Sequence, residues 1–79
     1  MLTIKVLGPG CSNCSTTAKR IEQAAEKLGL EIHLEKVTDL AAIMGYGALS
    51  TPGVVIDEKL VHSGGVPDLE QIGIWLSGQ

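Results

Sequence analysis

The order of apolar and polar positions along this chain predicts four strands and three helices. Short apolar runs predict strands over residues 3–7, 31–37, 54–56 and 60–62. Between the first two strands, apolar residues recur at helical spacing, which predicts a helix from about Cys11 to Leu28 with Gly29 as its C-terminal cap. A short helix over residues 40–44 is expected behind the cap Thr38-Asp39, and a last helix is expected to have Pro67 at its first position.

Each predicted element has a side that should face the core. The two longer helices carry apolar stripes of Cys14, Ala18, Ile21, Ala25 and Leu28, and of Leu69, Ile72, Trp75 and Leu76. Met44 and Tyr46 should line the edge of the core. Asp57-Glu58-Lys59 is typical of a tight turn between the last two strands, while Asp68 and Glu70 lie near the positive end of the last helix dipole.

The order β-α-β-α-β-β-α predicts the fold class. A right-handed crossover makes the first two strands parallel, and the later hairpin adds an antiparallel pair to the same sheet. We therefore expect an α/β fold with a four-stranded mixed sheet and helices on both faces. A length of 79 residues indicates one domain over residues 1–79.

Composition excludes several classes of function. Six basic against nine acidic residues give a net charge of −3, and the only aromatic residues are Tyr46 and Trp75, so neither a basic stripe nor a stacking platform for nucleic acid is present. No apolar run approaches the ~20 residues that span a bilayer, and no signal peptide is recognisable. We expect a cytoplasmic protein that binds neither nucleic acid nor membrane.

The chain's two cysteines, Cys11 and Cys14, lie at the predicted junction of strand and helix. A disulfide between them would close too small a loop to constrain the unfolded chain, so a redox or metal-binding role is favoured over a structural one. The unpaired N–H groups of a helix start stabilise a thiolate, and the pKa of Cys11 is expected below the ~8.5 of an ordinary cysteine. Cys14 lies one turn deeper on the apolar face. This asymmetry predicts that Cys11 is the nucleophile that forms a mixed disulfide and that Cys14 is the resolving cysteine.

A soft-metal site is the alternative interpretation of the two cysteines. Two thiolates can hold Cu(I) or arsenite, as in a metallochaperone. Structural zinc needs four ligands, and His33 and His62 lie too far apart in sequence for a familiar zinc motif, so no metal ligand is assigned. Heavy-metal-associated domains also place this motif between a strand and a helix, but they end on a strand, whereas this chain is predicted to end on a helix. An iron–sulfur carrier formed by a dimer is a third interpretation.

Three motifs in this order resemble the thioredoxin/glutaredoxin superfamily, in particular its small prokaryotic thioredoxin-like redox-active disulfide proteins. They are Gly10-Cys11-Ser12-Asn13-Cys14, Thr51-Pro52-Gly53 before the third strand, and Ser63-Gly64-Gly65 before the last helix. The resemblance covers essentially the whole chain and implies a thioredoxin-like fold of glutaredoxin size. It also implies thiol–disulfide oxidoreductase activity, with Cys11 as nucleophile and Cys14 as resolving cysteine.

The resemblance further implies a substrate-binding set. Pro52 matches the family's cis-proline, which leaves the backbone of Thr51 available to pair with an extended substrate segment. Gly64 and Gly65 match the glycine pair at which the backbone approaches bound glutathione. An apolar rim of Gly10, Cys11, Ala48, Leu49 and Gly64 would suit a transient protein contact.

The implied partners are a protein disulfide substrate and an upstream reductase, with this chain acting as a monomer. No resident cofactor is expected. The central Ser12-Asn13 differs from the Gly-Pro of thioredoxins and the Pro-Tyr of many glutaredoxins, and no basic residue is clearly placed for a glutathione carboxylate. Glutathione as a co-substrate therefore stays an open alternative.

Overall fold

The structure is a computed structural model that describes residues 2–8 and 12–78. Within these residues the elements follow the predicted order. They are β1 (Leu2–Leu7), α1 (Ser12–Leu28), β2 (Ile32–Val37), α2 (Leu40–Gly45), β3 (Gly53–Ile56), β4 (Lys59–Ser63) and α3 (Leu69–Ser77).

The strands form one mixed sheet in the order β2-β1-β3-β4. β1 pairs in parallel with β2 and antiparallel with β3, and β3 and β4 form the antiparallel hairpin. Because Ile56 pairs with Lys59, the hairpin turn is the two residues Asp57 and Glu58 and not the predicted three. The pairing then skips Val61, since Val55 faces Leu60 and Val54 faces His62.

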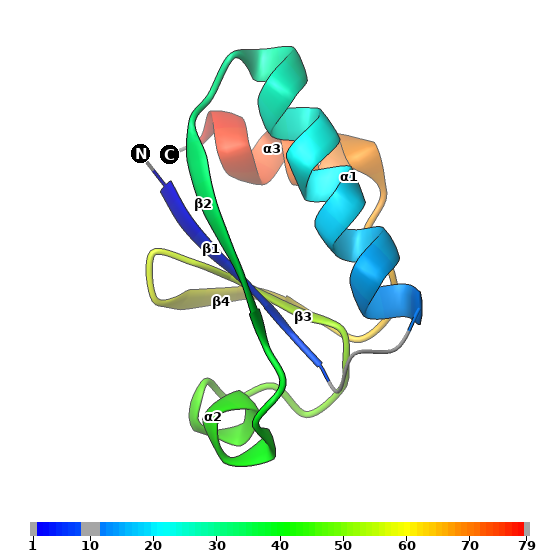
Figure 1. The fold of residues 1–79 in the computed structure, drawn as a ribbon, viewed down its shortest axis with the longest axis vertical. Coiled ribbons are helices and arrows are strands. Elements are labelled where there is room, and N and C mark those ends of the chain that lie inside the picture. Colours follow the sequence, from blue (N-terminus) through cyan, green and yellow to red (C-terminus); the bar gives the residue numbers. More distant parts are fainter. Residues whose placement is uncertain (1, 9–11, 79) are drawn as a thin grey trace.

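Different helices cover the two faces of the sheet (Figure 1). α1 and α3 lie side by side on one face, where they pack on β1 residues Ile4 and Val6. α2 covers one end of the other face, where Ile43 packs with Leu7 and Val55. The predicted fold class, a four-stranded mixed sheet with helices on both faces, is confirmed.

The buried side of α1 differs in part from the predicted stripe. Thr17 and Ala24 are buried in addition to the predicted residues, and the Thr17 hydroxyl donates to the Asn13 carbonyl at 2.8 Å, which satisfies this polar group inside the core. Leu28 is 47% exposed, so its predicted burial is wrong. Gly29 follows the helix at φ +68°, and Leu30 N–H donates to Ala25 O at 2.9 Å, which confirms the predicted glycine cap.

The last helix begins two residues later than predicted. Pro67 is not its first residue; it is buried ahead of the helix, and Asp68 is the N-cap, accepting from Gln71 N–H at 2.8 Å. Ile72 and Leu76 are buried as predicted, but Leu69 is 44% exposed. A polar cap side chain at Asp68 thus decides where the helix starts.

Two further expectations concern surfaces. Met44 is 73% exposed and does not line the core edge, whereas Tyr46 packs against the cluster under α2. Ala48 is 5% exposed and so does not belong to an exposed rim, but Leu49 beside it is 96% exposed. Among residues 2–8 and 12–78, no helix has the length and apolar content needed to cross a membrane.

Candidate functional site

Gly8 and Cys14 are in close contact where β1 ends and α1 begins. Gly8 is buried, and its N–H donates to the Val37 carbonyl at 2.9 Å, which extends the pairing of β1 with β2 past Leu7. A methyl group built on Gly8 would overlap the Sγ atom of Cys14. Cys14 is 4% exposed and belongs to the core cluster under α1. The absent side chain of Gly8 therefore leaves the space that the Cys14 sulfur uses.

The segment before β3 meets the same place. A methyl group on Gly8 would lie 3.7 Å from the Thr51 Cβ atom, so Thr51 lies close to both Gly8 and Cys14. The Thr51–Pro52 peptide bond is cis. Pro52 is fully buried while Thr51 is exposed, so the segment turns from the surface into the sheet between these two residues.

The two glycines after β4 complete this end of the sheet. The Gly64 N–H donates to the Pro52 carbonyl at 2.9 Å, and a methyl group on Gly64 would lie 3.1 Å from the Ser50 Cβ atom. Gly64 and Gly65 have φ of +84° and +74°, a conformation that residues with a Cβ rarely adopt. The sequence therefore needs glycine at both positions for the turn to come this close to the residue before Thr51.

Two side chains hold the turn of Gly64 and Gly65 in place. The His62 Nε2 atom lies 3.0 Å from the Gly65 carbonyl, and the His62 ring lies against Trp75 with centroids 5.5 Å apart. Arg20 donates from Nη1 to the Pro67 carbonyl at 3.0 Å. Sequence reasoning found none of these contacts, and those of His62 with Trp75 and of Arg20 with Pro67 depend on how α1, β4 and α3 pack.

The structure thus brings Cys14, Thr51, Pro52 and Gly64 together, with Gly65 next in the chain. Cys11, the predicted nucleophile, lies outside the described residues; in the sequence it directly precedes Ser12, the first residue of α1. Gly8 directly follows the first predicted strand, and nothing in the sequence assigned it a further role. Its position before a proline gave no sign that it would contact a cysteine six residues later.

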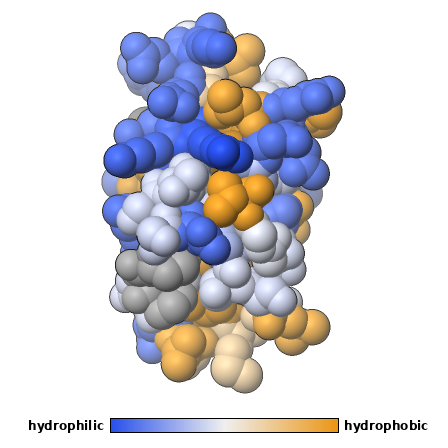
Figure 2. Space-filling view, turned by 90° about the vertical axis from the view of Figure 1, so that its right-hand side faces the viewer, coloured by the Kyte–Doolittle hydropathy of each residue, from blue (hydrophilic) through white to orange (hydrophobic). Residues whose placement is uncertain are grey.

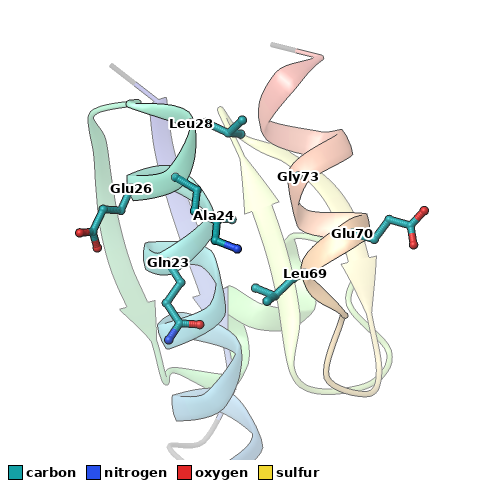
Figure 3. A pocket seen from close by; sticks show the side chains of 8 residues that line it. Gln23, Ala24, Glu26, Leu28, Leu69, Glu70 and Gly73 are labelled. Atoms are coloured by element: carbon teal, nitrogen blue, oxygen red, sulfur yellow. The ribbon is translucent and has the colours of Figure 1, made fainter.

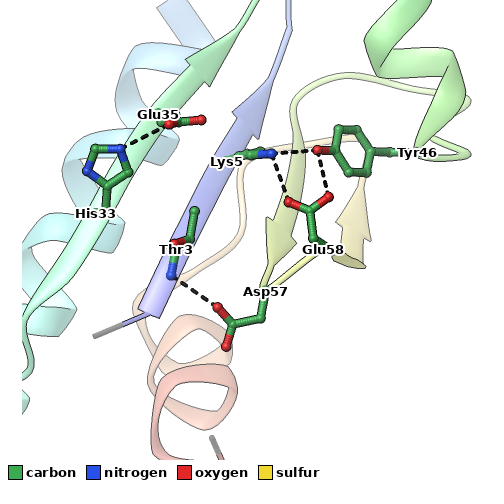
Figure 4. Close-up of polar contacts among 7 residues, drawn as sticks. All are labelled: Thr3, Lys5, His33, Glu35, Tyr46, Asp57 and Glu58. Atoms are coloured by element: carbon green, nitrogen blue, oxygen red, sulfur yellow. Dashed lines mark hydrogen bonds and ion pairs between the residues drawn. The ribbon is translucent and has the colours of Figure 1, made fainter.

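Apart from this candidate site, a cluster of polar side chains lies on the sheet face away from α1 and α3 (Figure 4). Lys5 Nζ donates to Tyr46 Oη at 2.7 Å and to Glu58 Oε1 at 2.8 Å, and Tyr46 Oη donates to Glu58 Oε2 at 3.2 Å. The hydrogen bond to Lys5, supported by Tyr46, holds the pKa of Glu58 below its usual value. Glu58 and Tyr46 likewise raise the pKa of Lys5. Lys5 therefore stays protonated and Glu58 stays ionised at neutral pH.

A groove of about 830 Å³ separates the later part of α1 from α3. Leu28 and Leu69 point into it, and Ala24 and Gly73 leave it open because they are small (Figure 3). This groove is the physical reason for the exposure of the two leucines, and it produces the hydrophobic surface between hydrophilic flanks in the middle of Figure 2. Its lining includes none of the predicted site residues that the structure describes.

Over residues 2–8 and 12–78, no three His, Cys, Asp or Glu side chains gather at distances that would hold a metal ion. His33 instead lies 3.0 Å from Glu35 on the edge strand β2, and His62 is engaged with Gly65.

Comparison with known proteins gives consistent results. Residues 2–77 match the family model described as a thioredoxin domain. The chain is 36% identical over 72 residues to a protein named thioredoxin from Methanocaldococcus jannaschii, covering 91% of this chain and 83% of that one. It is 32% identical over 72 residues to a thioredoxin from Methanothermobacter thermautotrophicus, covering 91% and 94%.

Solved structures agree on the fold. The chain superposes on thioredoxin-2, described as a component of malaria parasite protein secretion machinery, with a TM-score of 0.71 at 10% identity, covering 100% of this chain and 84% of that one. It superposes on glutaredoxin 1 from Francisella tularensis, complexed with cacodylate, with a TM-score of 0.50 at 16% identity and full coverage of both chains.

Proposed function

Because this chain belongs to the thioredoxin domain family, we propose that it is a small dithiol–disulfide oxidoreductase that exchanges a Cys11–Cys14 disulfide with protein partners. The observation that carries the proposal is the meeting of Cys14 with the cis Thr51–Pro52 segment at Gly8, at the end of the sheet where α1 begins. We further propose that residues 1–79 act as one domain.

In the proposed reaction, the Cys11 thiolate attacks one sulfur of a partner disulfide. A mixed disulfide forms, and the other partner sulfur leaves as a thiolate. Cys14 then loses its proton and attacks the sulfur of Cys11. The partner's second sulfur leaves, so the partner gains two electrons and the chain retains a Cys11–Cys14 disulfide. An upstream reductase returns the pair to the dithiol.

The burial of Cys14 gives a physical reason for these separate roles. Cys14, a residue that is 4% exposed beside Gly8, cannot be the first to meet a protein-sized disulfide. It can attack the Cys11 sulfur once that sulfur is part of a mixed disulfide, because Cys11 is only three positions away in the sequence. We therefore keep Cys11 as the nucleophile and Cys14 as the resolving cysteine.

Substrate would bind along the exposed Thr51 and the turn of Gly64 and Gly65. An extended partner segment can pair with backbone at Thr51, in the manner of strand addition. Leu40, Met44 and Leu49 are 65%, 73% and 96% exposed, and Figure 2 shows hydrophobic surface at the lower end of the molecule, where Figure 1 places α2. An exposed apolar surface of this kind fits a protein partner better than a small thiol.

The test is insulin reduction, with a redox titration of the two cysteines. Wild type should accelerate the reduction of insulin by dithiothreitol. In the redox titration its two cysteines should behave as a two-electron couple, with a reduction potential of about −270 mV if thioredoxin-like or about −200 to −230 mV if glutaredoxin-like. Cys11→Ser should abolish turnover. Cys14→Ser should retain the first attack and accumulate a mixed disulfide, detectable by mass spectrometry and cleaved by reductant.

The soft-metal alternative gives a different set of results. Tight stoichiometric binding of Cu(I) or arsenite, with no reversible disulfide and no mixed disulfide in Cys14→Ser, would replace the oxidoreductase proposal by a metal-binding one. Circular dichroism of each variant serves as the control, since a substitution in the core at Cys14 must first be shown to leave the fold intact.

A further inference from the structure

The hairpin turn has a conformation that its residues disfavour. Asp57 and Glu58 have φ of +47° and +69°, and turns of this kind usually use Asn-Gly or Asp-Gly. In the left-handed region the Cβ of a residue comes too close to the following carbonyl oxygen, which disfavours this conformation. Compensating contacts must hold the turn, and both side chains make them: Asp57 accepts from Thr3 N–H at 3.2 Å, and Glu58 from Lys5 at 2.8 Å (Figure 4).

Stability alone gives a poor reason for a glutamate at position 58. The Glu58 side chain is 68% exposed, and exposed ion pairs contribute little to folding. A glycine there would relieve the backbone strain and complete the favoured Asp-Gly pair. The role of the Glu58 side chain therefore lies in the group that it holds, the phenol of Tyr46. Glu58 reaches this phenol directly through Oε2 and indirectly through Lys5, which bonds to both residues.

Tyr46 is the residue from which the chain leaves α2 for the candidate site. Its N–H still bonds to the helix, at 3.2 Å from both the Ala42 and Ile43 carbonyls. Gly47 N–H bonds to Met44 O at 2.9 Å, and after the buried Ala48 the exposed residues 49–51 lead to Pro52. The far end of this segment is held by the buried Pro52, and its near end lies at Tyr46 and the buried Ala48.

The Lys5 ammonium also lies 5.3 Å from the centroid of the Tyr46 ring, so the tyrosine is held by its ring and by its hydroxyl. Lys5 is on β1, the second strand of the sheet, and its side chain is only 19% exposed. A side chain so enclosed is a fixed anchor on the sheet, and it adds to the support that the six-residue helix α2 and the buried Ala48 give this end of the loop.

We propose that Tyr46, clamped by Lys5 and Glu58, is a positioning residue that holds residues 47–51 in the conformation that receives the partner protein. This inference rests on the proposed function, because that function makes residues 47–51 a partner-binding segment. Glu58 acts through Tyr46 and touches no reacting atom. Loss of the clamp should leave the thiol chemistry intact and make partner binding harder, because the segment must then be ordered on binding.

The experiment compares Glu58→Gly with Asp57→Gly. These neighbours share the left-handed turn, but only Glu58 reaches Tyr46. For Glu58→Gly we expect a thermal midpoint at or above that of wild type, roughly fivefold faster amide exchange over residues 47–51 and a roughly fivefold higher KM for insulin, with kcat unchanged. Asp57→Gly should keep the wild-type KM and the wild-type exchange in this segment.

Two variants refine the result. Tyr46→Phe keeps the ring but loses the hydroxyl, and should raise KM as Glu58→Gly does. Glu58→Gln keeps an accepting oxygen and should recover part of the effect. The proposal is overturned if Glu58→Gly leaves both exchange and KM unchanged, or if Asp57→Gly shifts them equally. Wild type that fails to reduce insulin would instead sink the proposed function, and the exchange data would still decide whether Tyr46 positions the segment.

Discussion

Replacing Gly8 by alanine should destabilise this protein specifically through Cys14. A methyl group at position 8 would overlap the Cys14 Sγ atom, and it would lie at ordinary contact distances of 3.5 Å and 3.7 Å from the Cβ atoms of Cys14 and Thr51. Gly8 is buried, so the methyl group cannot turn into solvent. One sulfur atom is therefore the source of the conflict.

The magnitude follows from the cost of inserting a methyl group into a packed core, about 1–3 kcal/mol. For a domain of this size each kcal/mol shifts the thermal midpoint by roughly 4–8 °C, so Gly8→Ala should lower it by roughly 4–24 °C. The lower chain entropy of unfolded alanine offsets about 0.4–1 kcal/mol of this loss, so the net decrease should be smaller, at most roughly 21 °C.

The assay is thermal and urea unfolding under reducing conditions for wild type, Gly8→Ala, Cys14→Ala and the double variant. Cys14→Ala removes the overlapping atom and keeps the Cβ at its ordinary distance. Gly8→Ala should therefore cost at least about 1 kcal/mol less in the Cys14→Ala background, since contacting residues couple by roughly 0.5–3 kcal/mol. Gly73→Ala is the matched control, because a methyl group on Gly73 meets nothing within 4 Å. Equal costs of Gly8→Ala in both backgrounds would refute the reasoning.

Two further predictions concern charged side chains. Asp68→Ala should destabilise the protein by about 1 kcal/mol in urea unfolding, because it removes the acceptor 2.8 Å from Gln71 N–H, while Asp68→Asn should cost much less; equal losses would contradict a capping role. The pKa of Glu58 is lowered in the folded protein, chiefly by its hydrogen bond from Lys5. Its stabilisation is therefore present above the unfolded pKa of about 4.3 and lost as pH falls through the lower folded value. The stability difference between wild type and Glu58→Gln should be small at pH 7, because the Glu58 side chain is 68% exposed, and it should disappear as the pH falls below the folded pKa; a difference independent of pH would disprove the linkage.

The order of strands and helices could be predicted because its signals are local. Apolar spacing identifies α1, and Asp39 and Gly29 cap helices through contacts with residues close in sequence. The exposure of Leu28 and Leu69 could not be predicted in this way. Apolar spacing shows which side of a helix turns inward, but the groove between α1 and α3 depends on how closely two helices approach, which is a property of the pair.

The candidate site, too, could be predicted only in part from the sequence. Cys14, Pro52 and Gly64 could be expected to meet because motifs in that order resemble a known family. Gly8 could not be found, because a glycine before a proline has a sufficient local explanation as a strand end. Gly8 is needed because the Cys14 sulfur occupies the space that a side chain at position 8 would fill. A pattern of apolar and polar side chains cannot show this, since glycine has no side chain.

The hairpin turn is where local rules and the structure disagree most, and the disagreement is informative. Asp57-Glu58 has poor chemistry for two residues of positive φ, and the sequence predicts a tight turn over Asp57-Glu58-Lys59, one residue longer than the turn observed. The residues that compensate, Thr3 and Lys5, lie more than fifty positions earlier, and no local signal connects them. A strained turn persists only when its surroundings determine it, and such positions concentrate where function needs a fixed geometry. If the turn served folding alone, glycine would be the better residue at position 58; a glutamate there fits a turn whose side chain holds the Tyr46 hydroxyl together with Lys5.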